Sequence, residues 1–125
     1  MKNRLTLGIS MMLLACLAFV GFAQNSKEES KTLKVLILDG QNNHDWQSTT
    51  PVLKDALESN SRFTVDVSTS PAPKATDEEW ANWRPDFAKY DLVVTNYNGE
   101  MWPGEVRDSF VNFVKSGGGL VVVHA

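Results

Sequence analysis

Three short aliphatic runs along this chain each stop abruptly and give way to polar residues. The runs cover 35–38, 92–94 and 120–123, and helix-like stretches separate them. An unbroken run of Val, Ile and Leu is typical of a strand that is covered on both faces, because such a strand leaves no position for alternating polar residues. The pattern therefore predicts a parallel sheet with helices on both sides.

The stretch after the first run predicts a helix and then an edge strand. Thr50 and Pro51 indicate a helix start, with the threonine hydroxyl as the cap and the proline in the first turn. The apolar face of this helix comprises Val52, Leu53, Ala56 and Leu57. Residues 63–67 alternate apolar and polar positions, as expected of a strand at the edge of a sheet.

Two more helices are predicted further along the chain. Thr76 and Glu79 have the spacing of a capping box, which favours a short helix to about Trp83. A strand over 91–95 follows, and Pro103 then opens a third helix that the glycines at 117–119 terminate. The residues that follow the helical period in that helix are Val106, Phe110, Phe113 and Val114.

Strands that alternate with helices through short connections indicate a three-layer, flavodoxin-like α/β fold. Right-handed crossovers place the second strand outside the first and the third on its other side, which gives the strand order 2-1-3-4. The carboxyl ends of the first and third strands then adjoin at a switch point. Open α/β sheets bind their ligands at such a point.

The first 23 residues differ from the rest of the chain. Two basic residues precede an apolar stretch over 5–22, and small residues stand at 21 and 23, which together are typical of a secretory signal peptide. A lipoprotein signal around Cys16 is the less favoured alternative. Residues 24–32 are polar and predict a linker, which leaves 33–125 as the folded domain. We therefore expect an exported protein, periplasmic or extracellular, without a membrane span in its mature part.

Cysteine usage and charge exclude several classes of function. The one cysteine, Cys16, lies inside the predicted signal, so the mature chain would have no thiol for disulfides, metal binding or nucleophilic attack. The formal net charge is −3, and the basic residues are scattered rather than gathered in the stripe that nucleic acid requires. A neutral or weakly charged small molecule is the expected ligand, and nucleic acid is not.

The loop after the first strand holds the densest cluster of chemically active side chains. His44 can transfer protons near neutral pH, and Asp45 or Asp39 can orient it or act as a base. The amide of Asn43 can hold hydroxyl groups, and the flat face of Trp46 suits the C–H face of a sugar ring. This loop is therefore the centre of the predicted site.

Two later segments add to the same site. Asn96 and Asn98 follow the third strand and offer further amides, while Tyr97 offers a second aromatic face. His124 ends the fourth run and is a candidate second proton carrier. The predicted catalytic residues are His44, Asp45 and His124, and the predicted substrate-binding residues are Asp39, Asn43, Trp46, Asn96, Tyr97 and Asn98. Together they suit a polyhydroxylated ligand.

Structural interpretations of these residues remain open at this stage. Asp45 or Ser48 can cap the coming helix, the tryptophans at 46 and 102 can cover the ends of the core, and His124 can be a core residue. His44, Asp45, Asp39 and His124 are also acceptable metal ligands. No characteristic ligand spacing supports a metal, and no G-x-G-x-x-G loop supports a phosphate-bearing cofactor, so neither is predicted.

The segments 34–40, 43–46, 90–94 and 117–125 resemble the trehalose utilisation (ThuA-like) family. These segments read KVLILDG, NHDW, YDLVV and GGGLVVVHA. The resemblance implies a class I glutamine amidotransferase-like fold and a place in bacterial carbohydrate metabolism, with action on oxidised (3-keto) glycosides or sugars. It also implies that the family's domain continues past Ala125. Without a cysteine in the mature chain, glutamine hydrolysis is disfavoured.

Two classes of function follow from the sequence. The first is an exported sugar-processing enzyme domain, with His44 as general acid or base. The second is a carbohydrate-binding or interaction module without catalysis, because amides and aromatic faces suffice for binding. The sequence leaves open whether the domain is an enzyme. An oligomer, or a continuation of the chain, is expected to cover the apolar fourth strand.

Overall fold

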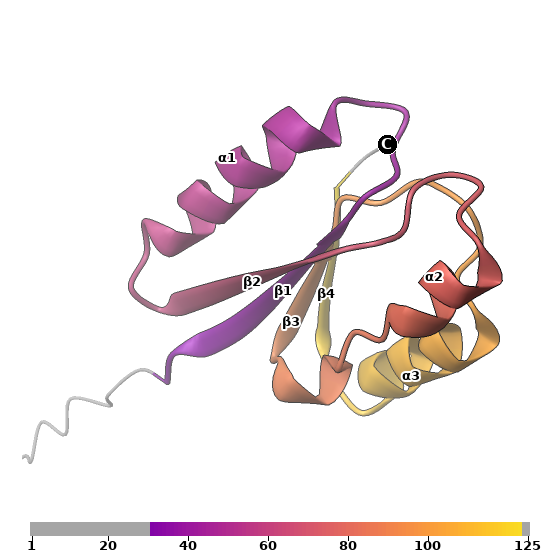
Figure 1. The fold of residues 1–125 in the computed structure, drawn as a ribbon. Helices are drawn as coiled ribbons and strands as arrows, with labels where there is room; N and C mark the ends of the chain where they lie inside the picture. Colours follow the sequence, from indigo (N-terminus) through magenta and orange to yellow (C-terminus); the bar gives the residue numbers. More distant parts are fainter. Residues whose placement is uncertain (1–30, 124–125) are drawn as a thin grey trace, which may run out of the picture.

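Four parallel strands form one sheet in the order β2-β1-β3-β4 in the computed structural model, which describes residues 31–123 (Figure 1). The strands are β1 (Leu33–Asp39), β2 (Phe63–Thr69), β3 (Leu92–Thr95) and β4 (Gly119–Val122). The predicted strand order is therefore confirmed. The predicted signal peptide, most of the predicted linker and His124 lie outside the described residues.

Helices cover the sheet from both sides, so the predicted three-layer α/β fold is also confirmed (Figure 1). On one face lies α1 (Trp46–Glu58), and on the other lie α2 (Asp77–Asn82), the short 3₁₀ helix η1 (Phe87–Lys89) and α3 (Gly104–Lys115). None of the helices within residues 31–123 is long and apolar enough to cross a membrane.

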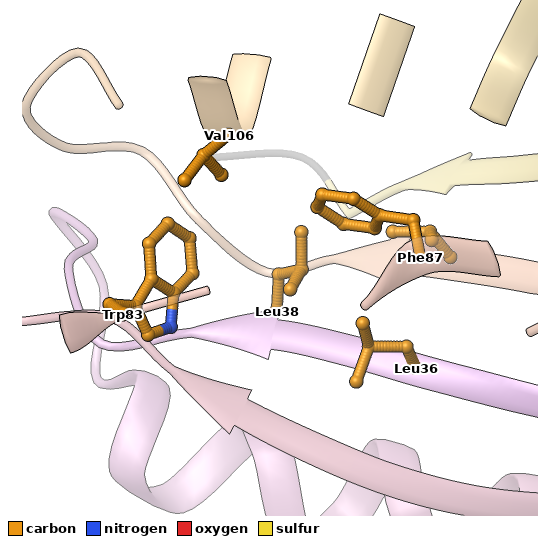
Figure 2. Packing of buried hydrophobic residues seen from close by; sticks show 6 residues of the cluster. Leu36, Leu38, Trp83, Phe87 and Val106 are labelled. Carbon is orange, nitrogen blue, oxygen red and sulfur yellow. The ribbon is translucent and has the colours of Figure 1, made fainter. Parts of the chain in front are cut away.

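The central strand β1 is buried on both faces, which explains its unbroken aliphatic run. Figure 2 shows Leu36 and Leu38 pointing from β1 toward Trp83, Phe87 and Val106 on the α2/α3 side. Val35 and Ile37 alternate with them and face the α1 side, where the core is completed by Val65, Val94, Leu53 and Leu57. Each face of the sheet therefore carries its own half of the core.

The first helix begins one turn earlier than predicted. The Asp45 carboxylate accepts hydrogen bonds from the backbone N–H and the hydroxyl of Ser48, so Asp45 is the cap and Trp46 the first helical residue. Aspartate is at least as good a cap as threonine, and it comes first along the chain. Pro51 consequently lies inside the helix, where its missing N–H leaves the carbonyl of Gln47 without its usual intrahelical bond.

The apolar faces of the two long helices are narrower than predicted. Leu53 and Leu57 pack on the sheet, but Val52 is 66% exposed and Ala56 also faces solvent. In α3, Val106 is buried and Phe110 and Phe113 pack on the core, whereas Val114 is 38% exposed. A helix that lies on a sheet buries a stripe, and residues at the margin of that stripe stay in solvent.

Local signals elsewhere act as the sequence predicts. Thr76 and Glu79 form the capping box of α2, with each side chain bonded to the other's backbone N–H. Gly117 adopts a φ of 95° just after α3 and stops that helix. The capping box starts the helix that precedes β3, and Gly117 ends the helix that precedes β4.

Candidate functional site

The loops that follow β1 and β3 lie side by side at the carboxyl edge of the sheet. The Asn98 N–H donates to the Gln41 carbonyl oxygen at 2.9 Å, and the Glu100 N–H donates to the Gln41 side-chain Oε1 at 2.8 Å. Gln41 is itself buried, although the residues after it are progressively more exposed. The loops after β1 and β3, which the sequence predicted to share this edge, are therefore joined there by hydrogen bonds.

Side-chain amides join the same two loops. Asn98 Nδ2 donates to Asn43 Oδ1 at 3.2 Å, and Asn42 Nδ2 donates to the backbone and side-chain oxygens of Asn96 at 3.2 and 3.3 Å. We call these two pairs the amide bridges. Their lengths lie at the long end of the range for N–H···O bonds, so they are weak. Asn43 and Asn98 are both exposed, so their remaining hydrogen-bonding capacity faces solvent.

Asn96 connects β3 to the first turns of α1. Its side chain is 3% exposed, and its Nδ2 donates to the hydroxyls of Thr49 at 3.0 Å and Thr50 at 3.1 Å. Both donors of this amide are thus used within the protein. Asn96 has a structural role that the sequence did not reveal, because Thr49 and Thr50 lie more than 40 positions away along the chain.

His44 stands exposed between an amide bridge and the helix cap. Its backbone N–H donates to Asn42 Oδ1 at 3.0 Å, and its carbonyl oxygen accepts from the Trp46 N–H at 2.9 Å. The backbone on both sides of His44 is therefore fixed by a tight turn. An exposed imidazole on a fixed backbone is available to a ligand that reaches this edge.

The Asp45 side chain caps the amino end of α1. The Ser48 hydroxyl and then the Ser48 backbone N–H stabilise its carboxylate and lower the pKa of Asp45 below the ordinary value of 3.8. Of the interpretations left open by the sequence, capping is the one that the geometry shows for this residue. A catalytic role for Asp45 stays a prediction, as does that of His124, which lies outside the described residues.

Asp39 lies deeper than any other predicted site residue. It is 2% exposed, and no donor within residues 31–123 reaches its Oδ1. Gly40, which follows it, has a φ of 111°, and a Cβ there would lie about 2.6 Å from the Ser70 backbone, so only glycine fits this turn. The turn at Gly40, which lies against Ser70, therefore fixes the end of β1 that carries the buried Asp39 carboxylate.

A cluster of aromatic residues lies on the face of the sheet opposite α1. Trp102 packs against Tyr97, Trp83 and Phe110, with ring centroids 5.4 to 5.5 Å apart. The Tyr97 hydroxyl donates to the Glu100 carbonyl oxygen at 2.6 Å, and burial raises the pKa of Tyr97 above its ordinary value. Trp102 therefore covers the end of the core, which is one of the interpretations that the sequence left open.

Two surface cavities are alternative ligand sites, and neither encloses the exposed side chains of Asn43 and His44. A shallow one of about 230 Å³ lies beside the β3–α3 loop, lined by Tyr97, Asn98, Trp102 and Arg107 among others. A larger one of about 870 Å³ lies along α3, from Glu105 to the turn at Gly117 and Gly118, and Tyr90 and Asp91 before β3 also line it; no residue of the loop after β1 does. We favour the carboxyl edge as the candidate site, because the exposed residues Asn43, His44 and Asn98 belong to the two loops that meet there. Within residues 31–123, no three His, Cys, Asp or Glu side chains are grouped to hold a metal ion.

Comparisons with known proteins bear on this arrangement. A family model described as trehalose utilisation (ThuA) matches residues 34–125. The chain belongs to the ThuA family. It is also similar to the crystal structure of a ThuA-like protein from Parabacteroides merdae, at 43% sequence identity and a TM-score of 0.71. That match covers 76% of this chain and 33% of the other, so the chain spans about a third of the length of that ThuA-like protein. No protein of curated function matches it.

Proposed function

We propose that this ThuA-family domain is exported and processes carbohydrates, acting on (3-keto) glycosides or sugars, with His44 as the group that transfers a proton. The Asn98–Asn43 hydrogen bond carries the proposal, since it brings the exposed amides of two loops together directly beside His44. The description of the family, trehalose utilisation, supports a sugar as the ligand.

The chemistry follows from the side chains at the edge. Amide groups exchange hydrogen bonds readily with hydroxyls, so Asn43 and Asn98 can hold a sugar ring by its hydroxyl groups. A carbon next to a keto group bears an acidic proton, and a histidine can accept such a proton near neutral pH. The Asp45 cap fixes where α1 begins and thereby positions the backbone of His44.

Turnover of a 3-keto-glycoside by the full-length protein tests this role. We expect His44→Ala to lower kcat by about 10²-fold or more, the usual contribution of general acid–base catalysis. Gln47→Ala is the matched control, because Gln47 is exposed in the first turn of α1 and has no assigned role. Equal kcat values for wild type and His44→Ala would remove His44 from the mechanism.

A carbohydrate-binding module is the second candidate, and the exposed amides of Asn43 and Asn98 favour it equally. Calorimetric titration with trehalose and its 3-keto derivative separates the two functions. Unchanged affinity in His44→Ala, together with the absence of product from wild type, would identify a binding module.

Export is the remaining part of the proposal, and the apolar segment at the start of the sequence supports it. The amino-terminal sequence of the protein recovered from a bacterial host tests it. A mature chain that begins at Gln24 is the expected result. A chain that keeps its first 23 residues and stays in the cytoplasm would contradict export.

A further inference from the structure

The buried polar side chains of the described domain gather near the carboxyl edge of the sheet. They are Asp39, Gln41, Thr50, Ser70 and Asn96. All but Asp39 bond within the protein: Gln41 to Glu100 and Pro71, Ser70 to Pro71, and Thr50 to Asn96. Asp39 differs from these four, since its Oδ1 is shielded from solvent and finds no donor within residues 31–123. The indole N–H of Trp102, on the other face of the sheet, is the second buried side-chain group without a partner in this part of the chain.

The position of Asp39 follows from the sheet register. Asp39 shares the face of Val35 and Ile37, which α1 covers, and it stands one step beyond the Leu38–Thr95 pair of β1 and β3. Its neighbour across the strands is therefore Asn96, at the usual strand spacing of about 4.8 Å. Asn96 directs its Nδ2 to Thr49 and Thr50 instead, so the nearest amide donor is already engaged.

A carboxylate oxygen buried in this way destabilises the folded state. A carboxylate can only accept hydrogen bonds, and burying one without a donor loses its hydration without replacement. Val35 and Ile37 show that this face of β1 accommodates aliphatic side chains. A buried polar atom without a partner therefore calls for a functional explanation, such as a ligand that brings the missing donor.

We propose that Asp39 Oδ1 is a ligand-binding atom that accepts a hydrogen bond from a hydroxyl group of a neutral, polyhydroxylated ligand. This inference rests on the proposed function and extends its site inward from the exposed amides to the end of β1. A hydroxyl fits better than a metal cation, because Asp39 belongs to no group of three His, Cys, Asp or Glu side chains in the described domain that could hold such an ion.

The ligand would reach Asp39 through the loop over 40–45, which leads from β1 into α1 across this end of the sheet (Figure 1). The amide bridges hold the outer part of this loop through long hydrogen bonds of 3.2 to 3.3 Å rather than through apolar packing. Hydroxyl groups of a ligand can replace such bonds at little cost in free energy. The outer part of the loop is thus held by hydrogen bonds that a sugar can exchange, whereas Gln41 at its inner end keeps shorter bonds of 2.8 to 2.9 Å to Asn98, Glu100 and Pro71.

The test combines melting temperature and affinity in the full-length protein. Asp39→Asn keeps the shape of the side chain and removes its charge, while Asp55→Asn makes the same change on the exposed side of α1 as a control. Without ligand, we expect Asp39→Asn to melt several degrees above wild type, because the desolvated charge is gone. In titrations with trehalose and its 3-keto derivative, we expect it to bind about tenfold more weakly, because the ligand hydroxyl then donates to a neutral amide oxygen instead of a charged carboxylate.

The possible results separate this inference from the function on which it rests. A melting temperature of Asp39→Asn equal to or below that of wild type overturns the inference by itself. Equal sugar affinity in wild type and Asp39→Asn also overturns it and leaves the proposed function standing. If wild type binds neither sugar, the proposed function is wrong, and so is the inference that Asp39 accepts a hydrogen bond from a sugar hydroxyl. The control Asp55→Asn should match wild type in both measurements.

Discussion

The two faces of the sheet differ sharply where the strands end. On the α1 face, the strand ends carry Asp39 and Asn96, which lie in polar surroundings beside Thr50. On the α2/α3 face, the corresponding region is filled by the rings of Trp83, Trp102 and Phe110. One face is closed mainly by packed rings, and the other is held mainly by hydrogen bonds. Each face has one buried polar group without a partner within residues 31–123, the Trp102 indole N–H on the first and Asp39 Oδ1 on the second. Under the proposed function, the aromatic face contributes mainly to stability and the polar face to ligand binding.

Neighbouring residues of one loop illustrate this division. Asn96 extends toward α1 and bonds to Thr49 and Thr50, while Tyr97 packs on Trp102 on the other face. Side chains alternate between the faces of an extended chain, so residues adjacent in sequence enter different environments. Adjacency in sequence to a polar site residue such as Asn96 therefore does not place an aromatic residue such as Tyr97 in the same surroundings.

Removing a ring from the aromatic face should have the largest effect on stability. Phe87 is 1% exposed and packs on Phe110 and Phe113, so Phe87→Ala should lower the free energy of unfolding by about 3–5 kcal/mol. Urea denaturation measures this loss, with Phe87→Leu as the milder control. A loss below about 1 kcal/mol would show that this face does not support the fold as described.

Substitution of Gly40 should disturb the polar face through the backbone. Gly40→Ala forces a side chain into positive φ and against the Ser70 backbone, which should cost about 1–3 kcal/mol. Gly104→Ala is the control, because a Cβ there would lie 3.8 Å from the Arg107 guanidinium, an ordinary van der Waals contact. Equal stability of the two variants in thermal denaturation would contradict the turn geometry after β1.

Loss of the bond from Asn96 to Thr49 should have a smaller effect. Thr49→Val removes the hydroxyl acceptor while keeping the shape, and the expected loss is about 0.5–1.5 kcal/mol of unfolding free energy. Thr49→Ser keeps the hydroxyl and should retain most of the stability. If Thr49→Val and Thr49→Ser unfold at the same urea concentration, Asn96 does not hold α1 through this contact.

The Asp45 cap should make the free energy of unfolding depend on pH, and this effect should be the smallest of those described. The pKa of Asp45 is lower in the folded protein, so the cap stabilises fully above the ordinary pKa of 3.8. Its contribution is lost as the pH falls through the lower folded pKa. The stability difference between wild type and Asp45→Asn should therefore shrink in acid, as followed by thermal denaturation from pH 6 to about pH 2. A difference that stays constant over this range would show that the charge of Asp45 does not contribute.

Most of the fold could be predicted from the sequence, and the details of the site could not. Aliphatic runs, the capping box of Thr76 and the glycine stop at 117 are local signals, so they indicated the strands, α2 and the end of α3 correctly. The start of α1 was misplaced, because Asp45 and Thr50 are both good caps and only the folded chain shows which one acts. The buried role of Asn96 depends on partners distant in sequence, and no pattern within the chain reveals them.

The central claim, that ligand binds at the α1 face of the carboxyl edge, can be tested by titrating the ¹⁵N-labelled protein with trehalose and following its NMR spectrum. We expect shifts in the backbone amides of 40–48 and 96–100, with the indole N–H signals of Trp80 and Trp83 unchanged. Shifts confined to those indoles, or to the amides of Asn112, Phe113 and Gly118 around the larger cavity, would contradict the account.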